Sequence, residues 1–196
     1  MPKVGMEPMR RQQLIDATIE VIADVGLRGA TITLISRRAG MSSGIISHYF
    51  GSKQALIEAT VRYLLTGLKN ELITRVTPTT TPEQRLMLIV EANFARLQQL
   101  SHTTKTWLSF WSRSMHDLEL HRLQNVNNKR LLSNLVSSFK KLMSEDDAKL
   151  AAELCAAMID GLWLRAVLSK SDKAQFAHSE NLAKNYVTTL IKQYGA

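Results

Sequence analysis

The stretch that decides the fold is residues 31–50, which reads TITLISRRAGMSSGIISHYF. A hydroxyl residue precedes each of two short apolar patterns, as is typical of helix N-caps. Thr31 or Thr33 can cap the first pattern, and Ser42 or Ser43 can cap the second. The stretch therefore predicts two consecutive short helices separated by a turn.

The small and apolar residues of this stretch lie where two steeply crossed helices need them. Ser36 is small at the crossing point, Gly40 tolerates the positive φ of a tight turn, and Ile46 supplies an apolar plug from the second helix. This spacing is typical of a helix-turn-helix, whose second helix enters the major groove of DNA. A purely structural helical hairpin satisfies the same spacing, so both interpretations stay open at this point.

Helical periodicity extends outward from this stretch in both directions. An apolar pattern over residues 9–25, followed by Gly26, precedes it, and a long apolar stripe over residues 53–75 follows it as a bridge between two regions. Thr81 and Ser144 each begin a capping box. No repeat and no credible strand is found. The further predicted helices cover residues 82–101, 105–115, 117–143, 145–170 and 179–193.

The composition fits an all-α protein. Nine Gly and four Pro in 196 residues are too few for the frequent turns of a β fold, and 45% hydrophobic residues suffice for a buried core. A single cysteine, Cys155, excludes an intrachain disulfide. Without a targeting segment or a run of about 18 apolar residues, we expect a cytoplasmic protein with no membrane partner. The net charge of +8 favours a polyanionic partner, or simply keeps the protein in solution.

Individual residues of this region resemble the DNA-binding domain of the tetracycline-repressor (TetR) family. The resemblance covers about residues 10–65, and Ser36 stands where the family usually has an equally small Ala. It implies an all-α, TetR-like fold of about nine helices, with a DNA-binding domain over residues 1–52 and a helical ligand-binding and dimerisation domain over residues 53–196. The residues that carry it are Thr31-Ile32, Ile35, Arg38-Ala39-Gly40-Met41-Ser42, Gly44-Ile45-Ile46-Ser47-His48-Tyr49-Phe50, Lys53 and Leu56.

The same resemblance identifies the positions that face DNA bases. Gly44, Ile45 and Ser47 would face the major groove, whereas Ile46 and Phe50 would face the core. The second helix contains no Lys or Arg, so base reading would depend on hydroxyls, close backbone approach and methyl contact. The complete set of predicted DNA-binding residues is Thr31, Thr33, Ser43, Gly44, Ile45, Ser47, His48, Tyr49 and Lys53.

Contacts to the DNA backbone are expected from other positions. Thr33, His48, Tyr49 and Lys53 match family positions on or near the phosphates. Tyr49 fits a core aromatic equally well before the resemblance is considered. An N-terminal arm offers further cations that would reach phosphates or a minor groove, namely Lys3, Arg10 and Arg11.

Aromatic residues of the larger region gather in two places. Trp107, Phe110 and Trp111 are spaced i, i+3 and i+4, which puts three rings on one helical face. Asp160 and Trp163 lie three residues apart in an otherwise apolar stretch, where an ionised carboxylate requires a partner. A cation bordered by aromatic faces would provide that partner. An aromatic core cluster, with the carboxylate paired to an arginine or across a subunit interface, satisfies the same pattern.

The larger region also resembles the choline-responsive branch of the family, whose members repress the genes of glycine betaine synthesis. The resemblance implies choline as the inducer, and the cage residues above, with Glu91 as a second counter-charge, are inferred to bind it. It implies no cofactor. The residues that carry it are Trp107-Leu108, Phe110-Trp111, Ser114-Met115-His116, Arg122-Leu123 and the stretches 130–136 and 159–165.

Two alternatives remain, a family member that senses another hydrophobic cation and a helical enzyme. His116 and His121 are five residues apart, which fits neither a metalloprotease helix nor a zinc finger, and no nucleophile elbow or phosphate loop is present. We therefore expect no catalytic residue and no metal site. A homodimer is expected, because the last two predicted helices carry apolar stripes that a monomer covers only in part: Leu154, Met158, Leu162, Leu182, Tyr186 and Leu190.

Overall fold

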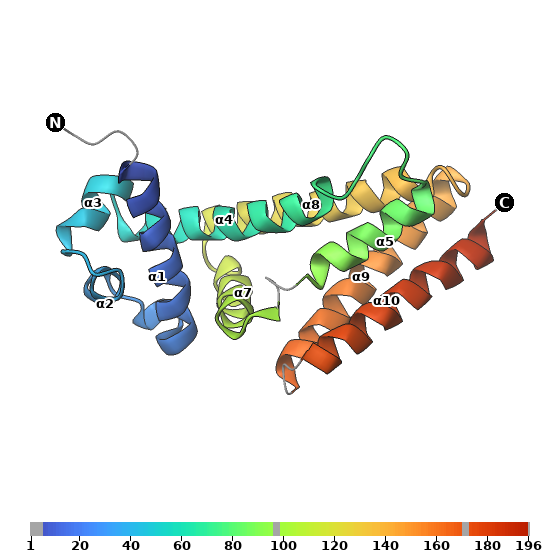
Figure 1. The fold of residues 1–196 in the computed structure, drawn as a ribbon. Helices are drawn as coiled ribbons and strands as arrows, with labels where there is room; N and C mark the ends of the chain where they lie inside the picture. Colours follow the sequence, from blue (N-terminus) through green and yellow to red (C-terminus); the bar gives the residue numbers. More distant parts are fainter. Residues whose placement is uncertain (1–5, 96–98, 170–172, 196) are drawn as a thin grey trace. The chain divides into compact units, whose positions relative to one another are not determined.

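The computed structural model describes residues 6–95, 99–169 and 173–195, and within these ranges the chain is helical (Figure 1). The only extended pairing among them is one isolated antiparallel bridge, between Met143 and Gly195. The predicted all-α fold is confirmed. In chain order the helices are α1 (Met6–Gly29), α2 (Ile32–Arg38), α3 (Gly44–Phe50), α4 (Lys53–Ile73), α5 (Pro82–Asn93), α7 (Ser101–Ser114), α8 (Leu118–Phe139), α9 (Glu145–Leu168) and α10 (Lys173–Tyr194).

Hydroxyl side chains begin several helices as the sequence predicts. The Thr31 hydroxyl accepts a hydrogen bond from the backbone N–H of Leu34, 3.2 Å away, and Thr81 forms a complete capping box with Gln84. The Ser144 hydroxyl caps α9 by accepting from the Asp147 N–H, 3.2 Å away, but the Asp147 carboxylate accepts from that hydroxyl, so the predicted second capping box is only half formed. The prediction is wrong for Ser43: this residue has helical dihedral angles, φ −64° and ψ −28°, and its hydroxyl makes no capping hydrogen bond.

Several helix boundaries differ from the predicted ones; α7, for example, begins at Ser101 and not at residue 105, and α8 ends at Phe139 and not at residue 143. Gly26, with φ 70°, kinks α1 instead of ending it, and the helix continues to Gly29. The α5 helix ends at Asn93 and not near residue 101, because the buried Phe94 leaves the helical conformation, with φ −109° and ψ 11°. The α10 helix begins at Lys173, six residues before the predicted start at residue 179.

The chain folds into two compact units. The first unit contains residues 1–66 and 100–124, and the second contains residues 67–99 and 125–196. This division differs from the expected boundary after residue 52 because α7 packs along α1. There the Thr106 hydroxyl donates a hydrogen bond to the Ile19 carbonyl, 3.2 Å away. Both α4 and α8 contribute residues to each unit, so the helix over residues 53–73 is not the only continuous connection.

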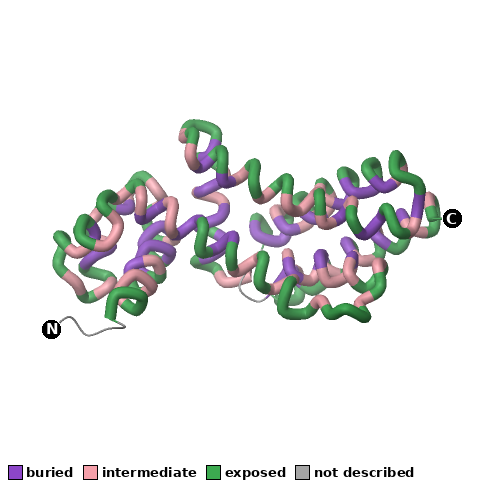
Figure 2. Tube along the Cα trace, turned by 90° about the horizontal axis from the view of Figure 1, so that it is seen from above, coloured by how far each residue is buried: buried purple, intermediate pink, exposed green. Residues whose placement is uncertain are grey.

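The helices of the N-terminal region share one apolar core (Figure 2). Leu14 and Ile22 of α1, Ile35 of α2, Ile46 of α3 and Leu56 of α4 are its central residues, each at most 3% exposed. The predicted plug, Ile46, is completely buried. Ile46 is the one fully buried side chain of α3, and the partly buried Ile45, Tyr49 and Phe50 pack against the same core.

The second unit is built on the paired helices α9 and α10, which lie side by side, with α5 against them (Figure 1). Small residues on α9 allow close approach, and Cys155 among them is fully buried, with a thiol pKa that burial raises to about 12. Arg85 of α5 donates hydrogen bonds of 2.7 Å to the Asn134 carbonyl and the Ser138 hydroxyl on α8. None of the helices, as far as the structure describes them, is both long and apolar enough to cross a membrane.

Candidate functional site

The exposed face of α3 presents short polar groups. Gly44, Ser47 and His48 are exposed, and so is Ser43 immediately before the helix. Ile45 is only partly exposed, because its side chain packs against the apolar core of the unit. Less of its side chain is therefore available for methyl contact with a base than the sequence predicts.

The neighbouring predicted residues lie at the two ends of this surface. Thr31 and Thr33 are exposed at the start of α2. The Tyr49 ring packs partly on the core and meets the His48 ring edge-on, with centroids 4.8 Å apart. The Lys53 ammonium donates a hydrogen bond to the Ala30 carbonyl, 3.1 Å away, which ties the start of α4 to the residue after α1.

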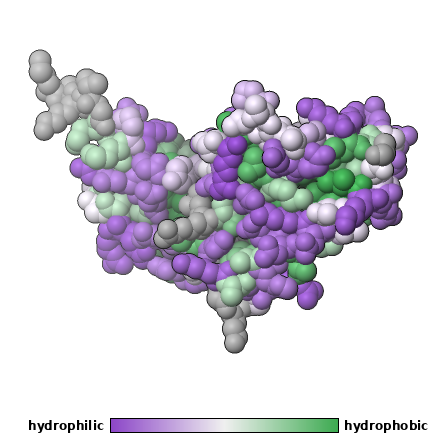
Figure 3. Space-filling model, turned by 45° about the vertical axis from the view of Figure 1, so that its right-hand side comes forward, coloured by the Kyte–Doolittle hydropathy of each residue, from purple (hydrophilic) through white to green (hydrophobic). Residues whose placement is uncertain are grey.

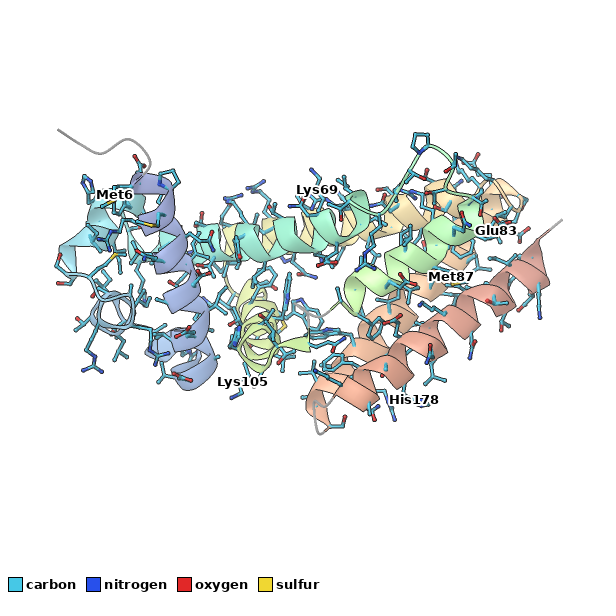
Figure 4. All side chains as sticks on the ribbon, viewed as in Figure 1. Met6, Lys69, Glu83, Met87, Lys105 and His178 are labelled. Atoms are coloured by element: carbon cyan, nitrogen blue, oxygen red, sulfur yellow. The ribbon has the colours of Figure 1, made fainter. Side chains whose placement is uncertain are left out.

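The predicted cationic arm takes part in the fold. The described part of α1 begins at Met6, which is exposed (Figure 4), and Lys3 lies outside the described residues. Arg10 reaches only Gln13 on its own helix, at 3.3 Å. Arg11 instead turns toward α3, where it donates a hydrogen bond to the Tyr49 carbonyl. Arg11 is thereby used within the fold, and a contact from it to phosphate stays a prediction.

A second arginine fastens α2 to α1. Arg38 forms ion pairs with Glu20 at 3.0 Å and Asp24 at 2.7 Å, and its hydrogen bonds to Asp24 and Glu20 raise the pKa of its guanidinium. The sequence contained a signal for this clamp, because Glu20 and Asp24 are four residues apart on one face of α1. Without a known helix crossing, that signal could not be connected to Arg38.

The aromatic residues of α7 are mostly interior. Trp107 and Phe110 are 4% and 2% exposed, with ring centroids 5.7 Å apart, whereas Trp111 is half-buried. Phe110 also lines a cavity of about 10 Å³. Residues of three other helices complete the lining, among them Ile22 of α1, Ile57 of α4 and Leu120 of α8. The ring of Phe110 thus faces residues of α1, α4 and α8 within the first unit.

On α9, Trp163 is buried and Asp160, one turn earlier, remains exposed. Desolvation by the surrounding protein nevertheless raises the pKa of the Asp160 carboxyl to about 6. Among the described residues, this carboxylate has no ion-pair or hydrogen-bond partner. An ionised carboxylate without a protein partner attracts a nearby cation, although solvent still reaches this side chain.

Glu91, the other predicted counter-charge, already has two cationic partners. Its carboxylate oxygens lie 3.2 Å from Arg75 and 2.7 Å from Lys184, and these cations also pair with Glu71 and Glu180. The network joins the segment after α4 to α5 and α10. Glu91 is therefore a weaker candidate for a ligand's charge than Asp160.

The six predicted ligand-binding residues divide between the two units. Trp107, Phe110 and Trp111 belong to the first, whereas Glu91, Asp160 and Trp163 belong to the second. The structure brings Trp107 and Phe110 together, and Asp160 and Trp163 share one helix. That the two groups form one cage remains a prediction.

The expected dimer stripes are partly exposed. Leu154 of α9 and Leu182 of α10 are 37% and 42% exposed, and Leu150, which the sequence reading missed, is 45% exposed. On the face that Figure 3 shows, hydrophobic surface forms patches between hydrophilic residues. Leu190 is a correction: it is 2% exposed, so it belongs to the core of its own chain.

Comparison with protein families gives two matches. Residues 14–60 match the family described as "Bacterial regulatory proteins, tetR family". Residues 82–192 match the family described as "BetI-type transcriptional repressor, C-terminal". Together these matches include α3 and most of the second unit.

Curated relatives and solved structures agree with these families. The chain is 48% identical over 197 residues to HTH-type transcriptional regulator BetI 2 of Chromohalobacter salexigens, covering 100% of this chain and 95% of that protein. It is 53% identical over 171 residues to BetI of Pectobacterium carotovorum, covering 86% and 88%. A transcriptional regulator from Rhodococcus superposes with a TM-score of 0.81 at 20% identity, covering 95% and 98%. A regulator from Saccharomonospora viridis, solved in complex with choline, has a TM-score of 0.76 at 18% identity, covering 92% and 96%.

A helix-turn-helix attached to a larger helical region defines a DNA-binding transcriptional regulator, and the chain belongs to the TetR family of such repressors. Its C-terminal region is of the BetI type. The relatives are regulators and not enzymes, so the alternative of a helical enzyme is dropped.

Proposed function

We propose that this repressor controls the genes of glycine betaine synthesis and that choline releases it from its operator. The observation that carries the proposal is the Asp160 carboxylate, which has no partner among the described residues and a pKa raised to about 6, one turn from the buried Trp163. The quaternary ammonium of choline is a permanent cation without an N–H to donate, so aromatic faces and one carboxylate suit it. A neighbour of this fold was solved with choline, which supports the compatibility of the fold with that ligand.

We propose that α3 enters the major groove of the operator. The exposed Gly44 and Ser47 permit close approach and hydrogen bonding to base edges, and the completely buried Ile46 holds the helix on the core. The exposed Thr33 of α2 and His48 of α3 are assigned to the DNA backbone. Lys53 has two ammonium protons left after its bond to Ala30, and these are available for a phosphate.

We expect a homodimer in solution. Leu150, Leu154 and Leu182 expose apolar surface that a second copy would cover, and a symmetric pair of helix-turn-helix units binds two half-sites about 34 Å apart. Sedimentation at micromolar concentration should therefore give about twice the 22.0 kDa chain mass. Leu154→Glu should shift the protein toward monomer, whereas Glu153→Gln on the neighbouring exposed position should not. A monomer for the wild-type chain would contradict the expectation.

Choline and operator DNA are expected to weaken each other's binding. An operator duplex is defined here as one that the wild-type protein selects from a random-sequence pool. If choline favours a dimer with the wrong half-site spacing, operator affinity falls by about 5- to 150-fold, and linkage requires choline affinity to fall by the same factor when operator is bound. Fluorescence anisotropy and calorimetry measure the two factors. Unequal factors, or none, would contradict the proposed switch.

A different hydrophobic cation is the second candidate for the inducer. It would use the same carboxylate and aromatic faces, so the geometry alone does not select choline. Thermal-shift measurements separate the two, because at equal concentration a ligand that binds the folded state more tightly raises the melting temperature further. We expect choline to raise it at lower concentration than tetramethylammonium, and glycine betaine, which carries its own carboxylate, to have little effect.

A further inference from the structure

The C-terminal end of α3, where Tyr49 and Phe50 pack on the core, is also contacted by one residue of α1. Arg11 donates a hydrogen bond to the Tyr49 carbonyl, and its guanidinium lies 4.3 Å from the centroid of the Phe50 ring. We propose that Arg11 positions the recognition helix for base reading and does not itself contact DNA phosphate. This inference rests on the proposed docking of α3 in the major groove.

The short length of α3 makes an anchor at this end important. The helix has seven residues, and one side chain, Ile46, is fully buried. The last carbonyls of a helix lack internal partners and carry partial negative charge, so a cation that donates to one of them both satisfies it and interacts favourably with the helix dipole. Arg11 does this at Tyr49, within the last turn.

The contact with Phe50 fixes the orientation of the Arg11 guanidinium as well as its distance from α3. A guanidinium is planar, so it stacks over the ring and donates to the neighbouring carbonyl in one geometry, which a lysine ammonium does not reproduce. Arg11 lies on α1 three residues before Leu14, and the Leu14 side chain is completely buried in the core. Arg11 thereby connects α3 to a part of α1 that cannot move independently.

Base reading by α3 is sensitive to such positioning. The helix has no Lys or Arg that could reach across a gap, so Gly44 and Ser47 read bases only if the backbone comes close. A small tilt of α3 would therefore reduce discrimination among sequences while leaving the general attraction to phosphates unchanged. The match to the TetR family begins at residue 14, so it does not include Arg11.

The test compares Arg11→Lys and Arg11→Gln with the adjacent control Arg10→Gln, whose side chain reaches only Gln13. Affinity for the operator duplex and for a random duplex is measured across a salt series. We expect both Arg11 variants to bind the operator about tenfold more weakly, to bind random DNA nearly as wild type does, and to keep the wild-type salt slope. A phosphate contact would instead lower both affinities in Arg11→Gln and reduce the slope by about one. That outcome, or wild-type discrimination by Arg11→Lys, would overturn the proposal.

A second variant keeps the test decisive if an Arg11 variant is poorly folded. Phe50→Leu retains the arginine charge and removes the ring, so it should reproduce the loss of operator discrimination at an unchanged salt slope. Combined with Arg11→Lys, it should add little further loss, because the two residues act as one contact. Full additivity would contradict the proposal. Unchanged choline affinity of these variants shows that the ligand site is intact. Ser47→Ala in the otherwise wild-type chain tests the docking of α3 separately, because it should reduce operator discrimination whether or not Arg11 positions the helix.

Discussion

Asp160→Asn is expected to weaken choline binding by about 100-fold at pH 7.5, since a charge-assisted contact of about 2 to 3 kcal/mol is lost. The substitution keeps the size of the side chain and removes only its charge. Glu153→Gln is the matched control, because Glu153 is an exposed acid on the same helix, seven residues earlier. Isothermal titration calorimetry compares the three proteins. Equal choline affinity for wild type and Asp160→Asn would exclude this carboxylate from the site.

The same pair of proteins should differ in pH dependence. The carboxyl pKa is raised to about 6 in the folded protein, so its ionised form, which attracts the cation, is depleted as pH falls below that value. Wild-type affinity is therefore expected to fall by up to about tenfold per pH unit below pH 6, whereas the Asn variant should be insensitive between pH 5 and 8.

The stability of the ligand-free protein should change in the opposite direction. An acid whose pKa is raised by desolvation binds its proton more tightly in the folded state than in the unfolded state. Its ionisation therefore destabilises the fold as pH rises from about 4 to 6, and the loss persists above pH 6. Asp160→Asn should thus melt at a slightly higher temperature than wild type at pH 7.5, and the difference is small because solvent still reaches Asp160.

Trp111→Ala is expected to reduce choline affinity by about 30-fold, because a desolvated cation–π contact is worth about 2 kcal/mol. Operator binding without choline should stay near the wild-type value. Trp111 is the best of the three tryptophans to test, because it is half-buried, whereas Trp107 and Trp163 are at most 5% exposed and their removal leaves cavities. Trp111→Phe should retain part of the response.

The measurement is the choline concentration that releases half of the bound operator duplex, with a melting curve to verify each fold. Wild-type choline affinity for a folded Trp111→Ala protein would exclude the α7 helix from the cage. In that case the choline site would consist of Asp160, Trp163 and residues outside α7.

Local features of the fold could be predicted from the sequence because they depend on residues close in the chain. Thr81 and Gln84 form their capping box within one helical turn, and the short helices around Gly40 follow from hydroxyl caps and a positive φ of 66° at the glycine. Ile46 is completely buried because it is the apolar residue in the middle of α3 on the face that packs against the core.

Contacts between distant residues could not be predicted in the same way. Arg11 and Phe50 are 39 positions apart, and Glu91 and Lys184 are 93 apart, so nothing in local periodicity connects them. The sequence assigned Phe50 to the core, Glu91 to the ligand and Arg11 to DNA, each without reference to its partner in the fold. The end of α5 was missed for a related reason, since Phe94 extends the apolar pattern of the helix although its backbone has already left it.

The absence of Lys and Arg from α3 has a consequence for how such a repressor changes over generations. On the proposed docking, residues that set the general attraction to DNA, and hence the speed of searching a chromosome, are not those that choose a target. Substitutions at Ser43 or Ser47 could redirect the protein to a new promoter without altering its mobility on other DNA. In descendants of this chain, the set of controlled genes can therefore change without a change in the rate at which the protein finds its sites.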